Sequence, residues 1–328
     1  MKTHVNTPGP DAPQSTPEPA HAPAADPFAD ARALAQQRGG FFIDLPRHAL
    51  IHIPPAEAPA RRRLIVSFEN LASFKLEGQR LPWGQNVFAS QGWDVLGVMA
   101  KEGDFFRSDD LFDALEKLRD DGFFAGFPDV SMYGTSMGGY GACAFAGLAP
   151  GCTVMAYAPQ SSLDPAIAPF DRRYPYARRL YPWRGRYLDA AEGLAQAGLA
   201  YILYDPSVPE DRQHMQRLTA AGPHVVPLPC PFMSHKLPPA FLRMRMLKQV
   251  ALAGLTGGLD PQGFARMIRA RRENNAHVMR VCERAVARGH LKLALGALNR
   301  QAERQPNWKV NKLRRHIRSK LGETGDQD

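Results

Sequence analysis

The stretch Val130-Ser131-Met132-Tyr133-Gly134-Thr135-Ser136-Met137-Gly138-Gly139 decides the fold of this chain. A short run that favours a strand ends in the pattern Gly-x-Ser-x-Gly, and the alanine-rich run at 140–148 predicts a helix. Strand, tight turn and helix in this order hold a serine on a strained turn, with its hydroxyl exposed above the sheet edge. Gly134 and Gly138 leave room for the neighbouring chain to pass. The pattern therefore predicts that Ser136 is a nucleophile.

In this context the chain resembles the α/β-hydrolase family, whose catalytic residues follow the order serine, acid, histidine. The run 199–204 is apolar, β-branched and aromatic, which predicts a buried strand. It ends in Asp205-Pro206-Ser207-Val208-Pro209-Glu210-Asp211, which resembles the family's acid loop. The resemblance favours Asp205 as the carboxylate that orients the histidine. Asp211 is the alternative, but the run Pro209-Glu210-Asp211 looks more like the first turn of the next helix, where acids interact favourably with the helix dipole.

The resemblance places the base in the loop after the last strand. A helix at about 210–221 and a strand at about 224–228 are followed by Pro229-Cys230-Pro231-Phe232-Met233-Ser234-His235-Lys236. His235 is therefore the expected general base. His214 and His224 fit this role less well, because the first belongs to the expected helix and the second to the start of the expected strand.

An oxyanion hole needs two donors, and the resemblance implies where each comes from. The first is the backbone N–H of Met137, which follows the serine. The second comes from the loop after the strand 64–68, where the His-Gly pair typical of lipases is absent and Glu69-Asn70 stands instead. We expect a backbone N–H of Glu69 or Asn70 to serve, with the Asn70 side-chain amide as an alternative.

Strands alternate with helices over most of the chain, which predicts a mainly parallel sheet with helices on both faces. Two runs at 40–45 and 49–53 predict an antiparallel hairpin that opens this sheet. The expected class is α/β, with the α/β-hydrolase fold over about 40–256, a cap insertion at 160–190 and a basic helical extension at 262–320. Residues 1–27 are rich in Pro and Ala and have almost no large apolar side chain, so we expect a disordered leader.

The 160–190 segment interleaves arginines with aromatic residues, which suits stacking on sugar rings or gripping of carboxylate and phosphate groups. Equally, the aromatics would pack on the core and the arginines would face water. If the segment binds substrate, a polar or anionic acyl compound fits better than a long lipid chain. The candidate substrate-binding residues are Arg172, Arg173, Tyr174 and Trp183.

The positive charge of the chain is concentrated at its C-terminal end. The whole chain has 41 Lys and Arg against 32 Asp and Glu, and 16 of these bases but only six of these acids follow residue 261. This segment predicts two helices at about 276–287 and 290–304, with Leu291, Leu295, Leu298 and Ala302 on one face. The basic surface is expected either to be solvated or to contact an anionic partner. No nucleic-acid motif accompanies it, so we do not expect nucleic acid to be that partner.

Composition excludes several classes of protein. The four cysteines are scattered without metal-ligand spacing, and Cys143 and Cys152 fall in expected core elements, which predicts that these two are buried thiols. No apolar run approaches a membrane span, and no signal peptide is expected. These features favour a cytoplasmic protein. The resemblance implies a carboxylesterase-like serine hydrolase that cleaves an ester-type bond of a small-molecule or saccharide substrate through an acyl-enzyme, without metal or organic cofactor. Two alternatives stay open: an acyltransferase with the same triad, and a hydrolase-like binding protein without activity.

Overall fold

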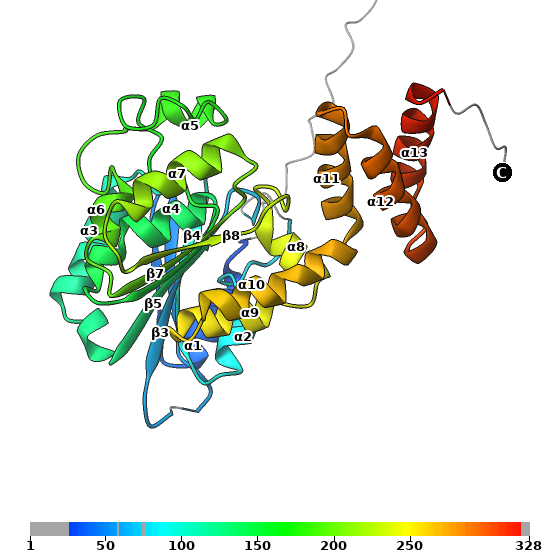
Figure 1. Cartoon of the computed structure of the whole chain (residues 1–328). Coiled ribbons are helices and arrows are strands. Elements are labelled where there is room, and N and C mark those ends of the chain that lie inside the picture. Colours follow the sequence, from blue (N-terminus) through cyan, green and yellow to red (C-terminus); the bar gives the residue numbers. More distant parts are fainter. Residues whose placement is uncertain (1–25, 58, 74–76, 323–328) are drawn as a thin grey trace, which may run out of the picture.

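The computed structural model describes residues 26–57, 59–73 and 77–322, so most of the predicted leader lies outside the described residues. Its centre is one sheet of eight strands in the order β1-β2-β4-β3-β5-β6-β7-β8 (Figure 1). The strands are β1 (Phe41–Asp44), β2 (His48–Ile53), β3 (Arg63–Phe68), β4 (Asp94–Ala100), β5 (Asp129–Thr135), β6 (Thr153–Tyr157), β7 (Leu199–Tyr204) and β8 (Val225–Pro229).

The sheet is mainly parallel, as the alternation of strands and helices predicts. β1 and β2 form the expected antiparallel hairpin, and β2 also pairs antiparallel with β4. All remaining neighbours, from β4 through β3 to β8, pair in parallel. The carboxyl ends of these parallel strands therefore meet at one edge of the sheet, where ligand sites of open α/β sheets lie.

Helices cover both faces of the sheet. On one face α3, α4, α6 and α7 bury side chains such as Leu115, Tyr140 and Leu218. On the other face α1, α2, α8, α9 and α10 bury side chains such as Phe88 and Phe241. The helices are α1 (Ala29–Gln37), α2 (Gln85–Ala89), α3 (Asp109–Asp120), α4 (Met137–Ala144), α5 (Pro175–Leu180), α6 (Ala190–Leu194), α7 (Pro209–Thr219), α8 (Leu237–Arg243), α9 (Leu247–Leu255), α10 (Pro261–Met267), α11 (Asn275–Ala287), α12 (Leu291–Arg304) and α13 (Trp308–Lys320).

The C-terminal segment differs in part from its prediction. Its first helix, α10, packs on the core of the sheet through Phe264. α11, α12 and α13 instead share a small core of their own around Leu298, Val310 and Ile317, and they stand beside the sheet domain (Figure 1). The sequence predicted only the first two of these three helices. The four side chains that it placed on one face of α12 pack in this small core.

Cys143 and Cys152 are buried and free, as predicted, and so are Cys230 and Cys282. α8 and α9 are separate helices, because Arg245 between them adopts a left-handed conformation with φ 57°. None of the helices in the described residues is both long enough and apolar enough to cross a lipid bilayer.

Candidate active site

Ser136 lies between β5 and α4 in a backbone conformation that few residues other than glycine adopt. Its φ is 52° and its ψ is −118°, and its N–H donates to the carbonyl oxygen of Tyr157 at 2.8 Å. The turn closes only because two glycines flank it. A Cβ on Gly134 would overlap the carbonyl of Gly138, and a Cβ on Gly138 would overlap the carbonyl of Phe68. The strained turn predicted from Gly-x-Ser-x-Gly is therefore present.

A chain of hydrogen bonds runs from the serine to a buried carboxylate. Ser136 Oγ lies 2.9 Å from Nε2 of His235. On the other side of the ring, Nδ1 lies 2.9 and 3.1 Å from the two carboxylate oxygens of Asp211. Nδ1–H thus donates to Asp211, which leaves the lone pair of Nε2 directed at the serine hydroxyl.

The carboxylate on His235 is that of Asp211, which corrects the expectation for Asp205. Asp205 is fully buried at the end of β7, and its two oxygens accept hydrogen bonds from the backbone N–H groups of Ser207, Phe232 and Ser234, and from the Ser207 hydroxyl. Its carboxylate is therefore fully engaged in holding the loop that carries the histidine. Phe232 and Ser234 both have positive φ, so this loop needs such support.

The acid itself stands in the first turn of α7. The chain leaves β7, makes a turn closed by Val208 N–H on the carbonyl of Asp205, and begins the helix at Pro209. Asp211 is almost completely buried there, 2% exposed. The first turn of the helix thus brings this carboxylate up to the imidazole.

The two predicted backbone donors beside Ser136 have different surroundings. Met137 is the first residue of α4, so its N–H has no acceptor within the helix. The N–H of Glu69, in contrast, donates to the carbonyl of Val98 at 3.1 Å, which corrects the expectation that it is free for an oxyanion. The N–H of Asn70 has no acceptor within the described residues.

The carboxylate of Glu69 has a structural partner. It is 3% exposed, pairs with Arg80 and accepts from the N–H of Ala100 at 2.8 Å. Burial raises the pKa of Glu69, although Arg80 and the N–H of Ala100 act in the opposite direction. The side-chain amide of Asn70 donates to Ser73 Oγ at 2.6 Å. Among the predicted donors of this loop, the backbone N–H of Asn70 is thus the group that stays available.

Tyr174, a predicted substrate-binding residue, lies against the serine and the histidine. Its hydroxyl is 3.4 Å from Ser136 Oγ and 3.3 Å from His235 Nε2, and it accepts from Gln160 Nε2 at 3.2 Å. Burial raises the pKa of Tyr174, so this hydroxyl keeps its proton and can donate at neutral pH.

Arg173, the second predicted residue, does not face an open site. Its guanidinium lies 2.8 Å from Asp211 and 2.8 Å from Asp171, two carboxylates that are nearly or fully buried. Asp171 in turn lies 2.8 Å from Nε2 of buried His214. Burial alone would raise the pKa of Asp171, but the hydrogen bonds from His214 and Arg173 outweigh burial and hold it below its usual value. Arg173 therefore joins the 160–190 segment to the carboxylate behind the histidine.

The remaining two candidates differ from each other. Arg172 is exposed. Trp183 packs on the rings of Phe105 and Tyr140 at 6.0 and 5.7 Å, and its indole N–H donates to the carbonyl of Ala177. Trp183 thus anchors the segment to the core instead of presenting a face to substrate.

Sequence reasoning missed the residue that fixes the other end of this segment. Arg107 is 1% exposed, and its guanidinium donates to the carbonyl oxygens of Pro182, Arg184 and Arg186 at 2.7–3.1 Å. Arg107 comes just before the acidic first turn of α3, and nothing in this sequence context predicts that its side chain is buried. Within the described residues, no three His, Cys, Asp or Glu side chains are grouped so that they could hold a metal ion.

Comparisons with known proteins give similarity in structure only. No family model matches the chain, and no curated protein matches it in sequence. A carboxyl esterase from the fungus Tuber melanosporum is 13% identical, with a TM-score of 0.43 over 70% of this chain and 85% of that chain. An acetyl ester-xyloside bifunctional hydrolase from Caldicellulosiruptor lactoaceticus is 14% identical, with a TM-score of 0.47 over 65% and 89%.

A capsule O-acetyltransferase of Neisseria meningitidis serogroup A is 12% identical, with a TM-score of 0.42 over 70% of this chain and 94% of that chain. At these identities the similarity concerns the arrangement of strands and helices. The chain itself combines a mainly parallel eight-stranded sheet, helices on both faces and a strained serine between β5 and α4. It has the α/β-hydrolase fold.

Proposed function

We propose that this chain is a serine hydrolase that cleaves an ester-type bond through Ser136, His235 and Asp211. The observation that carries the proposal is the continuous hydrogen-bonded chain from Ser136 Oγ through both ring nitrogens of His235 to Asp211, with both ring contacts at 2.9 Å. A serine becomes a nucleophile when a base within this reach can take its proton and a carboxylate fixes the ring of that base.

In the proposed reaction His235 Nε2 removes the proton of Ser136 while Oγ attacks the ester carbonyl carbon. The negative charge that develops on the carbonyl oxygen would be stabilised by the N–H groups of Met137 and Asn70. The start of α4 lies beside the end of β3, because a Cβ on Gly138 would meet the carbonyl oxygens of Phe68 and Glu69. The closeness of these two elements supports the proposal that the N–H groups of Met137 and Asn70 donate to the same substrate oxygen.

The tetrahedral intermediate then collapses. The imidazolium of His235 gives its proton to the leaving alcohol oxygen as the carbon–oxygen bond breaks, and an acyl group remains on Ser136. Water, deprotonated by the same nitrogen, attacks the acyl carbonyl and restores the serine. Asp211 keeps Nδ1–H oriented and stabilises the imidazolium in both halves of the reaction.

Polar groups around the serine favour a polar substrate, such as an acylated sugar, over a long lipid chain. The Tyr174 hydroxyl faces the serine, and the Nε2 of buried Gln160 donates to it. The Oε1 atom of Gln160 has no hydrogen-bond partner in the described part of the chain. A substrate hydroxyl beside Tyr174 would supply the missing donor. Arg172 stands two residues before Tyr174 in the sequence, and its side chain is exposed. Its guanidinium would suit an anionic group of the substrate.

The proposal is tested by steady-state hydrolysis of short-chain acyl esters, acetylated sugars and long-chain lipid esters by the purified full chain. We expect turnover of acetyl esters, with higher kcat/KM for acetylated sugars than for lipid esters, and its loss in Ser136→Ala without a change in Tm. Unchanged turnover in Ser136→Ala would contradict the proposal. Acyl transfer to an added sugar alcohol in place of water would identify the acyltransferase alternative, and no turnover with any ester would favour a binding protein.

A further inference from the structure

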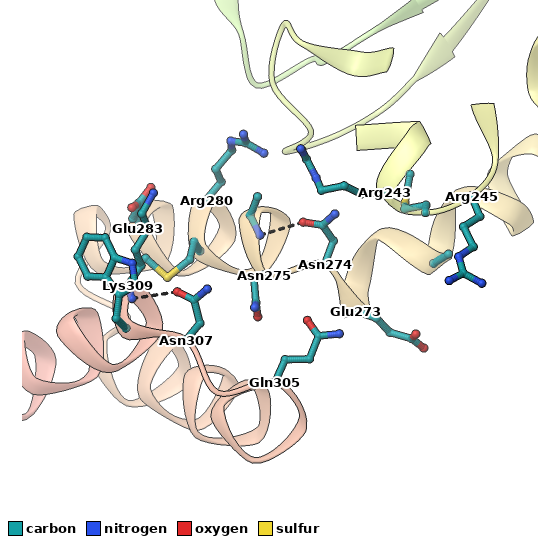
Figure 2. A pocket seen from close by; sticks show the side chains of 15 residues that line it. Arg243, Arg245, Glu273, Asn274, Asn275, Arg280, Glu283, Gln305, Asn307 and Lys309 are labelled. Atoms are coloured by element: carbon teal, nitrogen blue, oxygen red, sulfur yellow. Dashed lines mark hydrogen bonds between the residues drawn. The ribbon is translucent and has the colours of Figure 1, made fainter. Parts of the chain in front are cut away.

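A polar cleft of about 1000 Å³ lies outside the candidate active site. Its walls are the turn between α8 and α9, which carries Arg243 and Arg245, and the starts of α11 and α13 (Figure 2). None of its lining residues belongs to the Ser136 site. The cleft has therefore no part in the reaction proposed above.

Basic side chains dominate the charge of this cleft. Arg243, Arg245, Arg280 and Lys309 line it against two acids, Glu273 and Glu283. Among the described residues none of the four bases has a carboxylate within 4.0 Å, in contrast to Arg173 or Arg80. Figure 2 shows the side chains of Arg243 and Arg280 extending toward each other, and both also line a second, small cavity. Unpaired cations on a concave surface attract an anionic group.

Two helix N-termini add to this potential. α11 and α13 each have 13 residues, and their capping residues Asn274 and Asn307 both line the cleft. Each cap accepts a hydrogen bond from the N–H two residues later, at 2.9 Å. The positive ends of two helix dipoles therefore point to one cleft, in addition to the four cationic side chains.

The remaining lining groups suit a sugar. Asn275, Gln305 and the two capping asparagines offer amide groups that can both donate to and accept from hydroxyls. Trp308 also lines the cleft, is 67% exposed and has a flat apolar ring with a polar N–H; Lys309 Nζ lies over one face of this ring, 5.5 Å from its centre. The carboxylates of Glu273 and Glu283 can accept from hydroxyls, but they would repel the closely spaced phosphates of a nucleic acid.

One contact joins the cleft to the loop of the candidate base. Arg280 lines the cleft and also donates to the carbonyl oxygen of Phe232 at 3.3 Å, three residues before His235. A chain held in the cleft would thus lie next to the element that carries the histidine. We propose that the cleft binds an anionic oligosaccharide chain, with the arginines on its acidic groups and Trp308 on a sugar ring.

Binding is measured by calorimetry on the full-length Ser136→Ala chain, so that a failure of the hydrolase proposal leaves the result intact. The probes are an oligogalacturonate, a heparin-derived hexasaccharide, neutral cello-oligosaccharide, short-chain polyphosphate and single-stranded RNA. We expect at least one acidic oligosaccharide to bind more tightly than the neutral one and than polyphosphate. Adding Arg243→Gln and Arg245→Gln together to the Ser136→Ala chain should weaken this binding at least about tenfold. Adding Trp308→Ala alone should weaken it about tenfold.

Matched controls separate the cleft from the general basicity of the segment. Arg284→Gln with Arg288→Gln removes the same charge from exposed positions of the α11 region outside the cleft, and Leu293→Ala removes an exposed apolar side chain that is 74% exposed on α12. We expect less than about twofold change from either control. Equal weakening by the cleft and control variants would overturn the proposal, because it would mean diffuse attraction. So would the absence of binding by every acidic oligosaccharide, or tighter binding of polyphosphate or RNA without dependence on Trp308.

Discussion

The Nδ1 atom of His235 lies 2.9 Å from a carboxylate oxygen of Asp211, whereas the carboxylate of Asp205, just after β7, is hydrogen-bonded to Ser207, Phe232 and Ser234 and not to the ring. Two aspartates six residues apart thus hold different parts of the site. Asp211 faces the imidazole from the first turn of α7, and Asp205 binds the backbone of the loop that carries the imidazole.

Replacing each aspartate by asparagine should separate these two roles. Asp211→Asn removes the negative charge and lets an amide NH2 donate to Nδ1, which favours the wrong tautomer of His235, so kcat for ester hydrolysis should fall about 10³ to 10⁴-fold. Arg173 keeps its pairing with Asp171, so the fold should persist. The measurement is kcat at neutral pH together with the Tm of the same preparation.

Asp205→Asn should instead act on stability. In wild type, three backbone N–H groups donate to the carboxylate of Asp205. The NH2 group of an asparagine cannot accept from them, so we expect a loss of about 2 kcal/mol in the free energy of unfolding. Well below its Tm this variant should keep kcat within about tenfold of wild type. The reverse pattern, with kcat lost in Asp205→Asn and kept in Asp211→Asn, would restore Asp205 as the orienting acid.

The sequence located the acid loop, but the resemblance favoured Asp205, whereas the carboxylate on His235 is that of Asp211. Both aspartates stand in the same seven-residue run after β7, and the choice depends on how far the first turn of α7 reaches toward the histidine loop. That distance depends on tertiary packing. Ser136 and His235 were easier to find, because the Gly-x-Ser-x-Gly turn has a local steric cause and the histidine follows the last strand.

Gly138→Ala should disrupt the turn that carries the serine. A Cβ there would overlap the carbonyl of Phe68 and lie 2.8 Å from that of Glu69, and both are backbone atoms that cannot move aside alone. We expect a Tm at least several degrees lower and loss of most ester hydrolysis. Gly147→Ala is the control, because its nearest neighbour would be a side-chain atom at 3.5 Å. A Gly138→Ala protein with the wild-type Tm and activity would refute this account of the turn.

Tyr174→Phe should affect substrate handling more than folding. The ring keeps its packing on Phe105, while the hydroxyl beside Ser136 and His235 is lost. We expect kcat/KM for acetylated sugars to fall about tenfold, with little change in Tm. Tyr176→Phe, at a tyrosine of the same segment that is 60% exposed, should be neutral. Equal kcat/KM in the two variants would remove Tyr174 from the site.

His277 should make stability depend on pH. Burial, assisted by the charge of Arg271, lowers the pKa of His277 to about 4, and its Nδ1 is buried without a partner among the described residues. The unfolded chain binds this proton near its ordinary pKa of about 6.5. The stability linked to neutral His277 is therefore fully present above pH of about 6.5 and is lost as the pH falls toward about 4.

The check is the free energy of unfolding by urea at several pH values, for wild type and His277→Phe. We expect wild type to lose about 1 to 2 kcal/mol more than the variant between these two pH values. Parallel curves for the two proteins would show that His277 is not the titrating group. The comparison cancels the other groups that titrate in this range, because both proteins contain them.

The C-terminal segment shows the same limit of sequence reasoning. The spacing of Leu291, Leu295 and Leu298 placed them on one face of α12, but it did not show that this face packs against α11 and α13. α13 was missed, because its run of bases around buried Val310 and Ile317 has little apolar content. In the 160–190 segment, composition left substrate binding and packing on the core equally open. The structure shows Arg173 paired with buried Asp171 and Asp211, and Trp183 packed on Phe105 and Tyr140.

The most direct test of the central claim is labelling of the full chain with a fluorophosphonate probe, followed by mass spectrometry of its peptides. The probe reacts only with a serine that a neighbouring base has activated. We predict one modified residue, Ser136, in wild type and in Asp205→Asn, with labelling absent in Ser136→Ala and His235→Ala and strongly slowed in Asp211→Asn. A folded wild-type chain that takes up no label, or takes it up at another serine, would contradict the account.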